Sequence, residues 1–259
     1  MSATAAIALQ ADALAVAVPG RTLCNGLALA VRPGECWVVV GPNGAGKTTL
    51  LATLAGLRTP AAGAIAYDGV PITSLTPRQC ALKRAWLPQA SIDFFPATVL
   101  ETVLVGRHPH LSRWGWESAS DMTMARVALG AVGLAGWETR EVGTLSGGER
   151  RRVAIAALLA QDADLMLLDE PSAHLDLGQQ IVVLDFLTRL ARERNKALVM
   201  VLHDIHLALR YGDGAIAIGN GRVVAGPAAA VLDAAALSTL FGHPLVAVGS
   251  GNARTLLPA

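Results

Sequence analysis

A glycine-rich segment between residues 41 and 49 constrains the fold more than any other feature of this chain. Its residues are Gly41, Pro42, Asn43, Gly44, Ala45, Gly46, Lys47, Thr48 and Thr49, and they match the phosphate-binding pattern G-x-x-x-x-G-K-[ST]. The apolar run Cys36–Val40 before it predicts a buried strand, and the run 50–56 after it predicts a helix. A strand, a glycine loop and a helix in this order predict an α/β fold that binds a nucleotide.

The residue types in this loop suit a chain of phosphates. Glycines let successive backbone N–H groups turn toward one anion, and the following helix directs its positive end to the same place. Lys47 can reach the β- and γ-phosphates, and the Thr48 hydroxyl can ligate Mg²⁺. The alternative is an ordinary glycine turn, but the complete motif between a strand and a helix favours nucleotide binding.

Two acids follow another predicted strand. The apolar run Leu165–Leu168 ends in Asp169 and Glu170. Because ligands bind at the carboxyl ends of parallel strands in open α/β sheets, these acids are expected near the glycine loop. Asp169 would hold Mg²⁺, and Glu170 could orient and deprotonate an attacking water. By themselves the two acids could equally belong to an ordinary loop.

Two further side chains stand at the ends of predicted strands. Gln89 lies in the segment 86–89, just after another short apolar strand, and its neutral amide could contact Mg²⁺ or water. His203 follows the run 197–202, and its imidazole could bond the γ-phosphate. His203 and His206 also have helix-face spacing for a metal, but no further ligand spacing supports that alternative.

Composition excludes several classes of function. The net charge of +1, without a basic block, argues against nucleic acid as a partner. The longest apolar run, residues 153–160, is too short to span a bilayer. Cys24, Cys36 and Cys80 lack metal spacing and are expected to be packing residues in a reducing compartment. These features predict a cytosolic protein that can still dock on a membrane component.

The segment 145–149, Leu-Ser-Gly-Gly-Glu, adds a second anion-binding pattern. Ser146 and Glu149 have the spacing of a capping box, which predicts the start of a helix. The free N–H groups of Gly147 and Gly148, with the helix dipole, can bind an anion there. The segment looks like the signature of the ATP-binding cassette (ABC) ATPases.

The order of motifs strengthens this resemblance, which covers about residues 5–245. The glycine loop, Gln89, the signature, Asp169 with Glu170, and His203 follow one another as in an ABC cassette, and 172–176 resembles its D-loop. The resemblance implies an α/β P-loop NTPase fold with a RecA-like core, an antiparallel β subdomain and a helical subdomain. The last would span about 90–145, and 246–259 would be a C-terminal tail.

The resemblance also implies cofactors and partners. Such cassettes bind ATP and Mg²⁺ and work as head-to-tail pairs, so Ser146, Gly147, Gly148 and Asp176 would meet the nucleotide of a second copy. The pair would drive a dimeric integral-membrane permease from the cytoplasmic face of the inner membrane, and act with a periplasmic substrate-binding protein only indirectly. Many cassettes stack adenine on an aromatic residue, but Val18 stands at that position here, which predicts weaker adenine binding and looser base selectivity.

The segment 98–110 bears on the type of transporter. It predicts an amphipathic helix followed by a Gly-Arg-x-Pro-His turn, and it resembles the matching part of ATPases that power uptake of ferric siderophores, haem and cobalamin. The expected function is therefore ATP hydrolysis that drives import. An ABC exporter ATPase and a non-transport ABC ATPase remain as alternatives.

Overall fold

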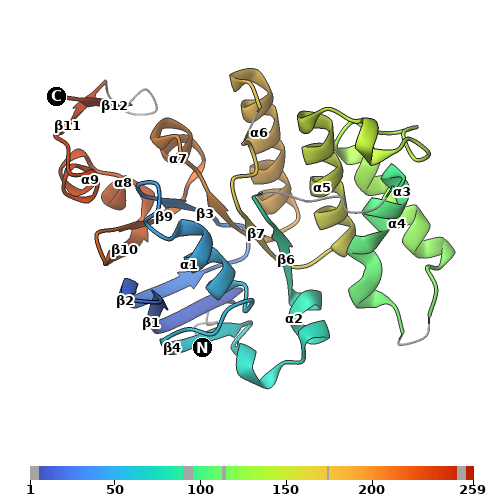
Figure 1. Cartoon of the computed structure of the whole chain (residues 1–259), viewed down its shortest axis with the longest axis horizontal. Coiled ribbons are helices and arrows are strands. Elements are labelled where there is room, and N and C mark those ends of the chain that lie inside the picture. Colours follow the sequence, from blue (N-terminus) through green and yellow to red (C-terminus); the bar gives the residue numbers. More distant parts are fainter. Residues whose placement is uncertain (1–5, 90–95, 113–114, 174, 250–254) are drawn as a thin grey trace, which may run out of the picture.

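The computed structural model describes residues 6–89, 96–112, 115–173, 175–249 and 255–259. Strands and helices alternate along most of the chain and build a layered α/β architecture (Figure 1), which confirms the predicted fold class. His174, in the D-loop-like segment, and residues 90–95, at the start of the predicted helical subdomain, lie outside the described residues.

A six-stranded sheet forms the centre of the molecule, with strand order β10-β9-β3-β8-β7-β6. Its strands are β3 (Cys36–Val40), β6 (Arg84–Leu87), β7 (Leu165–Leu168), β8 (Ala197–Val201), β9 (Gly214–Gly219) and β10 (Arg222–Pro227). Neighbouring strands from β6 to β9 run parallel, and β10 pairs antiparallel with β9. The parallel pairing brings the carboxyl ends of β3, β6, β7 and β8 to one edge, which is where the predicted site residues follow.

An antiparallel sheet and one helix cover one face of the central sheet. The sheet has the order β2-β1-β4-β5, and its strands are β1 (Leu9–Val18), β2 (Arg21–Val31), β4 (Ala62–Tyr67) and β5 (Val70–Pro71). Its apolar side chains share a buried cluster with α1 (Lys47–Leu54) and with one face of the central strands. Cys24 belongs to this cluster and Cys36 to the one on the opposite face, as expected of packing residues.

Helices that follow the later strands cover the other face. They are α6 (Leu177–Glu193), α7 (Ile205–Tyr211), α8 (Ala228–Val231) and α9 (Ala234–Phe241). They bury apolar side chains in one cluster with the central strands. The short helices α8 and α9 follow β10, and β9 and β10 form a hairpin joined by Asn220 and Gly221. Asn220 and Gly221 have φ of 51° and 74°, the conformation that a type I′ turn requires.

A helical region lies at one end of the molecule and has a core of its own (Figure 1). It contains α3 (Val99–Leu104), the 3₁₀ helix η2 (Val105–His110), α4 (Ala119–Ala131), the 3₁₀ helix η3 (Val142–Thr144) and α5 (Gly147–Gln161). The apolar cluster of this region includes residues of α5. Two further short helices, η1 (Ile72–Ser74) and α2 (Pro77–Lys83), lie between β5 and β6 in the chain. The boundaries predicted for the helical subdomain stay a prediction.

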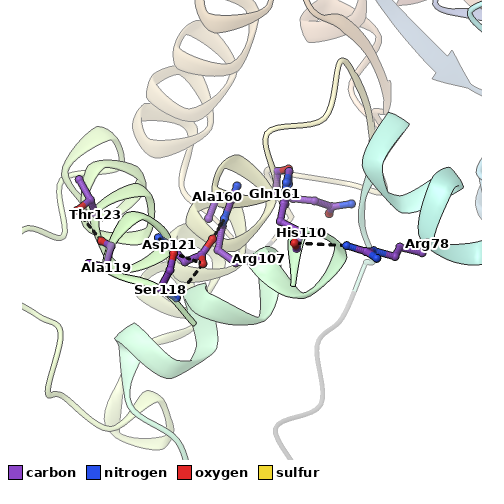
Figure 2. A network of polar contacts seen from close by, with 9 residues as sticks. All are labelled: Arg78, Arg107, His110, Ser118, Ala119, Asp121, Thr123, Ala160 and Gln161. Atoms are coloured by element: carbon purple, nitrogen blue, oxygen red, sulfur yellow. Dashed lines mark hydrogen bonds and ion pairs between the residues drawn. The ribbon is translucent and has the colours of Figure 1, made fainter. Parts of the chain in front are cut away.

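The Gly-Arg-x-Pro-His segment forms η2, a 3₁₀ helix, where a turn was expected. A β-carbon on Gly106 would lie 2.0 Å from the Ala157 carbonyl oxygen, so only glycine lets this backbone rest on α5. His110 Nε2 lies 2.8 Å from the Gln161 carbonyl oxygen, and Arg78 of α2 donates to the His110 carbonyl (Figure 2). Arg78 also donates to the Pro109 carbonyl. The segment therefore fastens the helical region to α2 and to the end of α5.

The segment expected to be a C-terminal tail carries a small hairpin. β11 (Leu245–Val248) pairs antiparallel with β12 (Thr255–Pro258). Among the described residues, no helix combines the length and the apolar character needed to cross a membrane.

Candidate active site

The glycine loop connects β3 to α1, as the motif predicts. A β-carbon on Gly41 would lie 2.0 Å from the Ile218 carbonyl oxygen, so the loop can pass β9 only with glycine at this position. Gly46 has φ of 102° and precedes α1, whose first turn no side chain caps. The first N–H groups of α1 therefore remain available for phosphate oxygens.

Lys47 is the first residue of α1 and is buried against the loop, with 7% of its surface exposed. Its ammonium group donates to the carbonyl oxygens of Gly41 at 2.9 Å and Pro42 at 3.0 Å. Burial lowers the pKa of Lys47, and the nearby charges of Glu170 and Asp169 act in the opposite direction. The loop thus holds a cation beside the uncapped start of α1, and both features attract phosphate.

Asp169 follows β7 and is fully buried. Its N–H donates to the Leu87 carbonyl at 2.8 Å, which continues the pairing of β7 with β6 past the strand end. Neither of its carboxylate oxygens has a hydrogen-bond partner among the described residues. Burial raises the pKa of Asp169, and the nearby Thr48 hydroxyl opposes this. A buried carboxylate without a partner, next to a hydroxyl, is a donor set that fits Mg²⁺.

The Glu170 side chain lies between those of Gln89 and His203, which were also predicted as site residues because each follows a predicted strand. The Gln89 amide donates to Glu170 Oε2 at 2.9 Å, and His203 Nε2 contacts Glu170 Oε1. Glu170 itself has φ of 49°, in the left-handed region that non-glycine residues rarely occupy. The structure therefore brings Gln89, Glu170 and His203 together, with the backbone of Glu170 in a strained conformation at their centre.

His203 owes its position to the turn between β8 and α7. Leu202 donates its N–H to the Val39 carbonyl at 3.1 Å, so the chain follows β3 for one residue beyond the strand. Asp204 then caps α7 by accepting from the N–H groups of His206 and Leu207. Between these two fixed points, His203 turns its ring toward Glu170.

A cavity of about 520 Å³ joins the glycine loop to the catalytic candidates. Its lining includes Lys47, Thr48, Gln89, Glu170 and His203, so most of the predicted nucleotide-site residues share one space. Residues of the β1–β2 hairpin also line it. They are Val18, Arg21 and Leu23, and no aromatic side chain is among the lining residues described.

The residues predicted for the second anion site lie elsewhere. None of Ser146, Gly147, Gly148 and Asp176 is among the described residues that line the cavity. Ser146 caps α5 in the predicted capping box with Glu149, and Asp176 caps α6. Ser146 and Asp176 therefore each stand at the start of a helix, where backbone N–H groups are available to an anion, and outside the cavity of their own chain.

Two arginines at the site were not anticipated. Arg21 lines the cavity and donates to the Gly44 carbonyl at 3.3 Å. Arg151 is buried on α5 and donates to carbonyls of the loops that carry Gln89 and Glu170. Helical spacing offered a signal for Arg151, because it shares a stripe with the buried Ile155 and Leu158. No comparable signal existed for Arg21.

Comparison with known proteins decides the family. Residues 24–173 match the family model described as ABC transporter. A hemin import ATP-binding protein from Nocardia farcinica is 45% identical over 232 residues, which cover 88% of this chain and 78% of that protein. The chain belongs to the ABC transporter family.

Two further comparisons agree with this assignment. A cobalamin import ATP-binding protein from Halobacterium salinarum is 39% identical over 83% of this chain and 54% of that protein. The dimeric structure of a bacterial ABC transporter cassette has a TM-score of 0.73 and 26% identity, covering 85% of this chain and 98% of that one. The ABC protein described here is thus an ATPase with the fold of such a cassette.

Proposed function

We propose that this ABC ATPase hydrolyses ATP at the cavity between the glycine loop and Glu170, and that this hydrolysis drives an importer. The observation that carries the catalytic part is the placement of Glu170 between the Gln89 amide and the His203 ring, at the cavity that Lys47 also lines. A carboxylate in this position can accept a proton from water that attacks the γ-phosphate.

Each neighbour of Glu170 has a role in this proposal. Gln89 orients the carboxylate through its amide N–H, and can contact the attacking water without adding charge. His203 holds the other carboxylate oxygen and lies within the same cavity, so its ring can donate to a γ-phosphate oxygen. Lys47 and the first N–H groups of α1 bind the phosphates and offset their charge.

The site also fits Mg²⁺. Asp169 and the Thr48 hydroxyl would hold the ion, with Gln89 within reach from β6. The support is the buried carboxylate of Asp169, whose oxygens have no partner among the described residues. When bound, the ion would neutralise charge on the β- and γ-phosphates.

Hydrolysis is proposed to require two copies of the chain. The start of α5, at Ser146 and Gly147, is not among the residues lining the chain's own cavity, yet it offers an anion site of backbone N–H groups and a helix dipole. We infer that it closes over the nucleotide of a second copy, with Asp176 nearby. The similar cassette whose structure is dimeric supports the association of two copies.

The cargo class is proposed to be a metal chelate of the haem, cobalamin or ferric siderophore type. The support is the similarity to proteins named for hemin import and cobalamin import, together with the Gly-Arg-x-Pro-His segment. The pair of ATPases would bind a membrane permease on its cytoplasmic face, and a periplasmic binding protein would deliver the cargo without contacting this chain.

Uptake in a strain that lacks the gene tests this proposal. Radiolabelled cobalamin, haem and ferric siderophores would be supplied, and the strain would be complemented with the wild type, Glu170→Gln or Lys47→Ala. Loss of one uptake, restored only by the wild type, supports a hydrolysis-driven importer and names the cargo. Restoration by Glu170→Gln would contradict the catalytic assignment, and unchanged uptake of all three cargoes would contradict the proposed cargo class.

A further inference from the structure

Arg151 lies within α5, five residues after Ser146, and is almost completely buried, with 8% of its surface exposed. Its guanidinium group donates four hydrogen bonds of 3.0 Å or less, and all of the acceptors are backbone carbonyl oxygens. The acceptors are Pro88 at 2.8 Å, Asp169 at 2.7 Å, Glu170 at 2.8 Å and Pro171 at 3.0 Å.

This arrangement is unusual for a buried cation, because no carboxylate oxygen accepts a hydrogen bond from it among the described residues. Burial lowers the pKa of Arg151 to about 10, and the nearby charges of Asp169 and Glu170 raise it. Filling such a position with an apolar side chain would remove the cost of burying a charge. What the guanidinium fork supplies here is several donors in fixed directions.

The acceptors belong to two loops that follow neighbouring parallel strands. Pro88 follows β6 and precedes Gln89, whereas the carbonyls of Asp169, Glu170 and Pro171 follow β7. These three successive carbonyls can converge on one point because Glu170 has φ of 49°. Converging carbonyl dipoles repel one another, and the guanidinium group offsets that repulsion. Arg151 thus stabilises the bent backbone that directs the Glu170 side chain.

The position of Arg151 on α5 connects this loop with the start of the helix. Fewer than two helical turns separate Ser146 from Arg151, and a helix transmits displacement over that length without bending. We propose that Arg151 is a positioning residue that couples the first turn of α5 to the orientation of Glu170 and Gln89. This inference rests on the proposed roles of Glu170 as the base and of Ser146 at the nucleotide of a second copy.

The coupling predicts a specific kinetic signature. Arg151 is not among the described residues that line the nucleotide cavity, and the glycine loop makes its own contacts through Lys47. Loss of the guanidinium group should therefore leave ATP affinity unchanged and lower kcat. A misplaced catalytic group typically costs about 100-fold in rate, so the expected decrease lies between about tenfold and 100-fold.

Arg151→Met and Arg151→Lys would test the inference, with Arg126→Met on the exposed surface of α4 as a matched control. Methionine keeps much of the length and removes all donors, whereas lysine keeps the charge but loses the planar fork. ATP affinity would be measured with a fluorescent nucleotide, kcat by phosphate release, and folding by the melting temperature. We expect unchanged affinity for all variants, the largest fall in kcat for Arg151→Met, and a smaller fall for Arg151→Lys.

Two results with a folded Arg151→Met variant would overturn the inference: a wild-type kcat, or an equal loss of ATP affinity and kcat. If Arg151→Met does not fold, a wild-type kcat in Arg151→Lys would overturn it. The proposed role of Glu170 is tested separately by comparing the wild type with Glu170→Gln. If that substitution left turnover intact, the base assignment would fail, and the Arg151 variants would still report whether α5 controls turnover.

Discussion

The carboxylate of Asp121 joins two elements of the helical region, because each of its oxygens has a different partner. Oδ1 accepts from Arg107 Nε at 2.9 Å, and Oδ2 accepts from the N–H and hydroxyl of Ser118, which closes the capping box of α4 (Figure 2). Arg107 also donates to the Ala160 carbonyl near the end of α5. The buried Arg107–Asp121 pair therefore links η2, α4 and α5.

Asp121→Asn should destabilise the protein, because the amide cannot balance the buried Arg107 charge. Breaking a buried ion pair on one side costs about 3 kcal/mol or more. Urea unfolding would measure the difference in free energy. Glu101→Gln is a matched control, since Glu101 occupies the same capping-box position in α3 but is exposed. Equal losses for the two variants would mean that capping alone accounts for the effect.

The same pair predicts how stability depends on pH. The hydrogen bonds from Ser118 and the Arg107 guanidinium hold the pKa of Asp121 well below its usual range. A carboxyl group whose pKa is depressed by folding contributes stability above its unfolded pKa, near 4, and loses that contribution as the pH falls further. The stability difference between the wild type and Asp121→Asn should therefore be full at pH 7 and smaller at pH 3. A difference that grew as the pH fell would contradict this interpretation.

Glu170→Gln should bind ATP but nearly stop turnover. The amide keeps the shape of the side chain and cannot accept a proton, so the loss should be about 10²- to 10⁴-fold in kcat. ATP should also hold two copies together, because the cleavage that separates them is blocked. Size-exclusion chromatography with and without ATP would detect the dimer, and phosphate release would measure kcat. Normal turnover would show that another group is the base.

Val18→Tyr should strengthen nucleotide binding and sharpen base selectivity. Val18 lines the cavity and offers no ring, and stacking of a base on an aromatic side chain contributes about 1–3 kcal/mol. We expect the Kd for ATP to fall roughly fivefold or more. Titrations with ATP and GTP would measure this, with Val127→Tyr as an exposed control outside the cavity. If the wild type were already as selective for adenine as the variant, Arg21 and Leu23 would be sufficient to recognise the base without an aromatic ring.

Ser146→Arg should spare ATP binding and abolish ATP-dependent dimerisation. A long cationic side chain at the start of α5 would fill the space proposed for the phosphates of a second copy's nucleotide. Nucleotide titration of the variant and chromatography in the Glu170→Gln background would separate the two effects. Intact hydrolysis in Ser146→Arg would argue that a single chain completes its own site.

The parts of the site that sequence could predict are those tied to the ends of strands. Lys47, Glu170, Gln89 and His203 each follow a short apolar run, and parallel strands carry their carboxyl ends to one edge. The convergence of these residues is therefore a property of topology, which the alternation of strands and helices already indicates.

The parts that sequence could not predict depend on contacts between distant loops. Arg151 stands among three consecutive arginines, and its role depends on two loops meeting more than 80 positions apart in the chain. Arg21 reaches the cavity because the β1–β2 hairpin folds over the glycine loop. The sequence predicted only a C-terminal tail where β11 and β12 form a hairpin, because short exposed strands show little hydrophobic periodicity.

The uncapped start of α1 has a consequence for the stability of the whole protein. The other α-helices of eight or more residues in the described part of the chain are preceded by a serine or aspartate cap whose side chain accepts a backbone N–H, whereas α1 is preceded by Gly46. At the proposed site, the phosphates of a nucleotide would supply the acceptors that such a side chain provides elsewhere. A bound nucleotide would then be a structural part of the helix, and its cellular concentration would enter the free energy of unfolding by mass action.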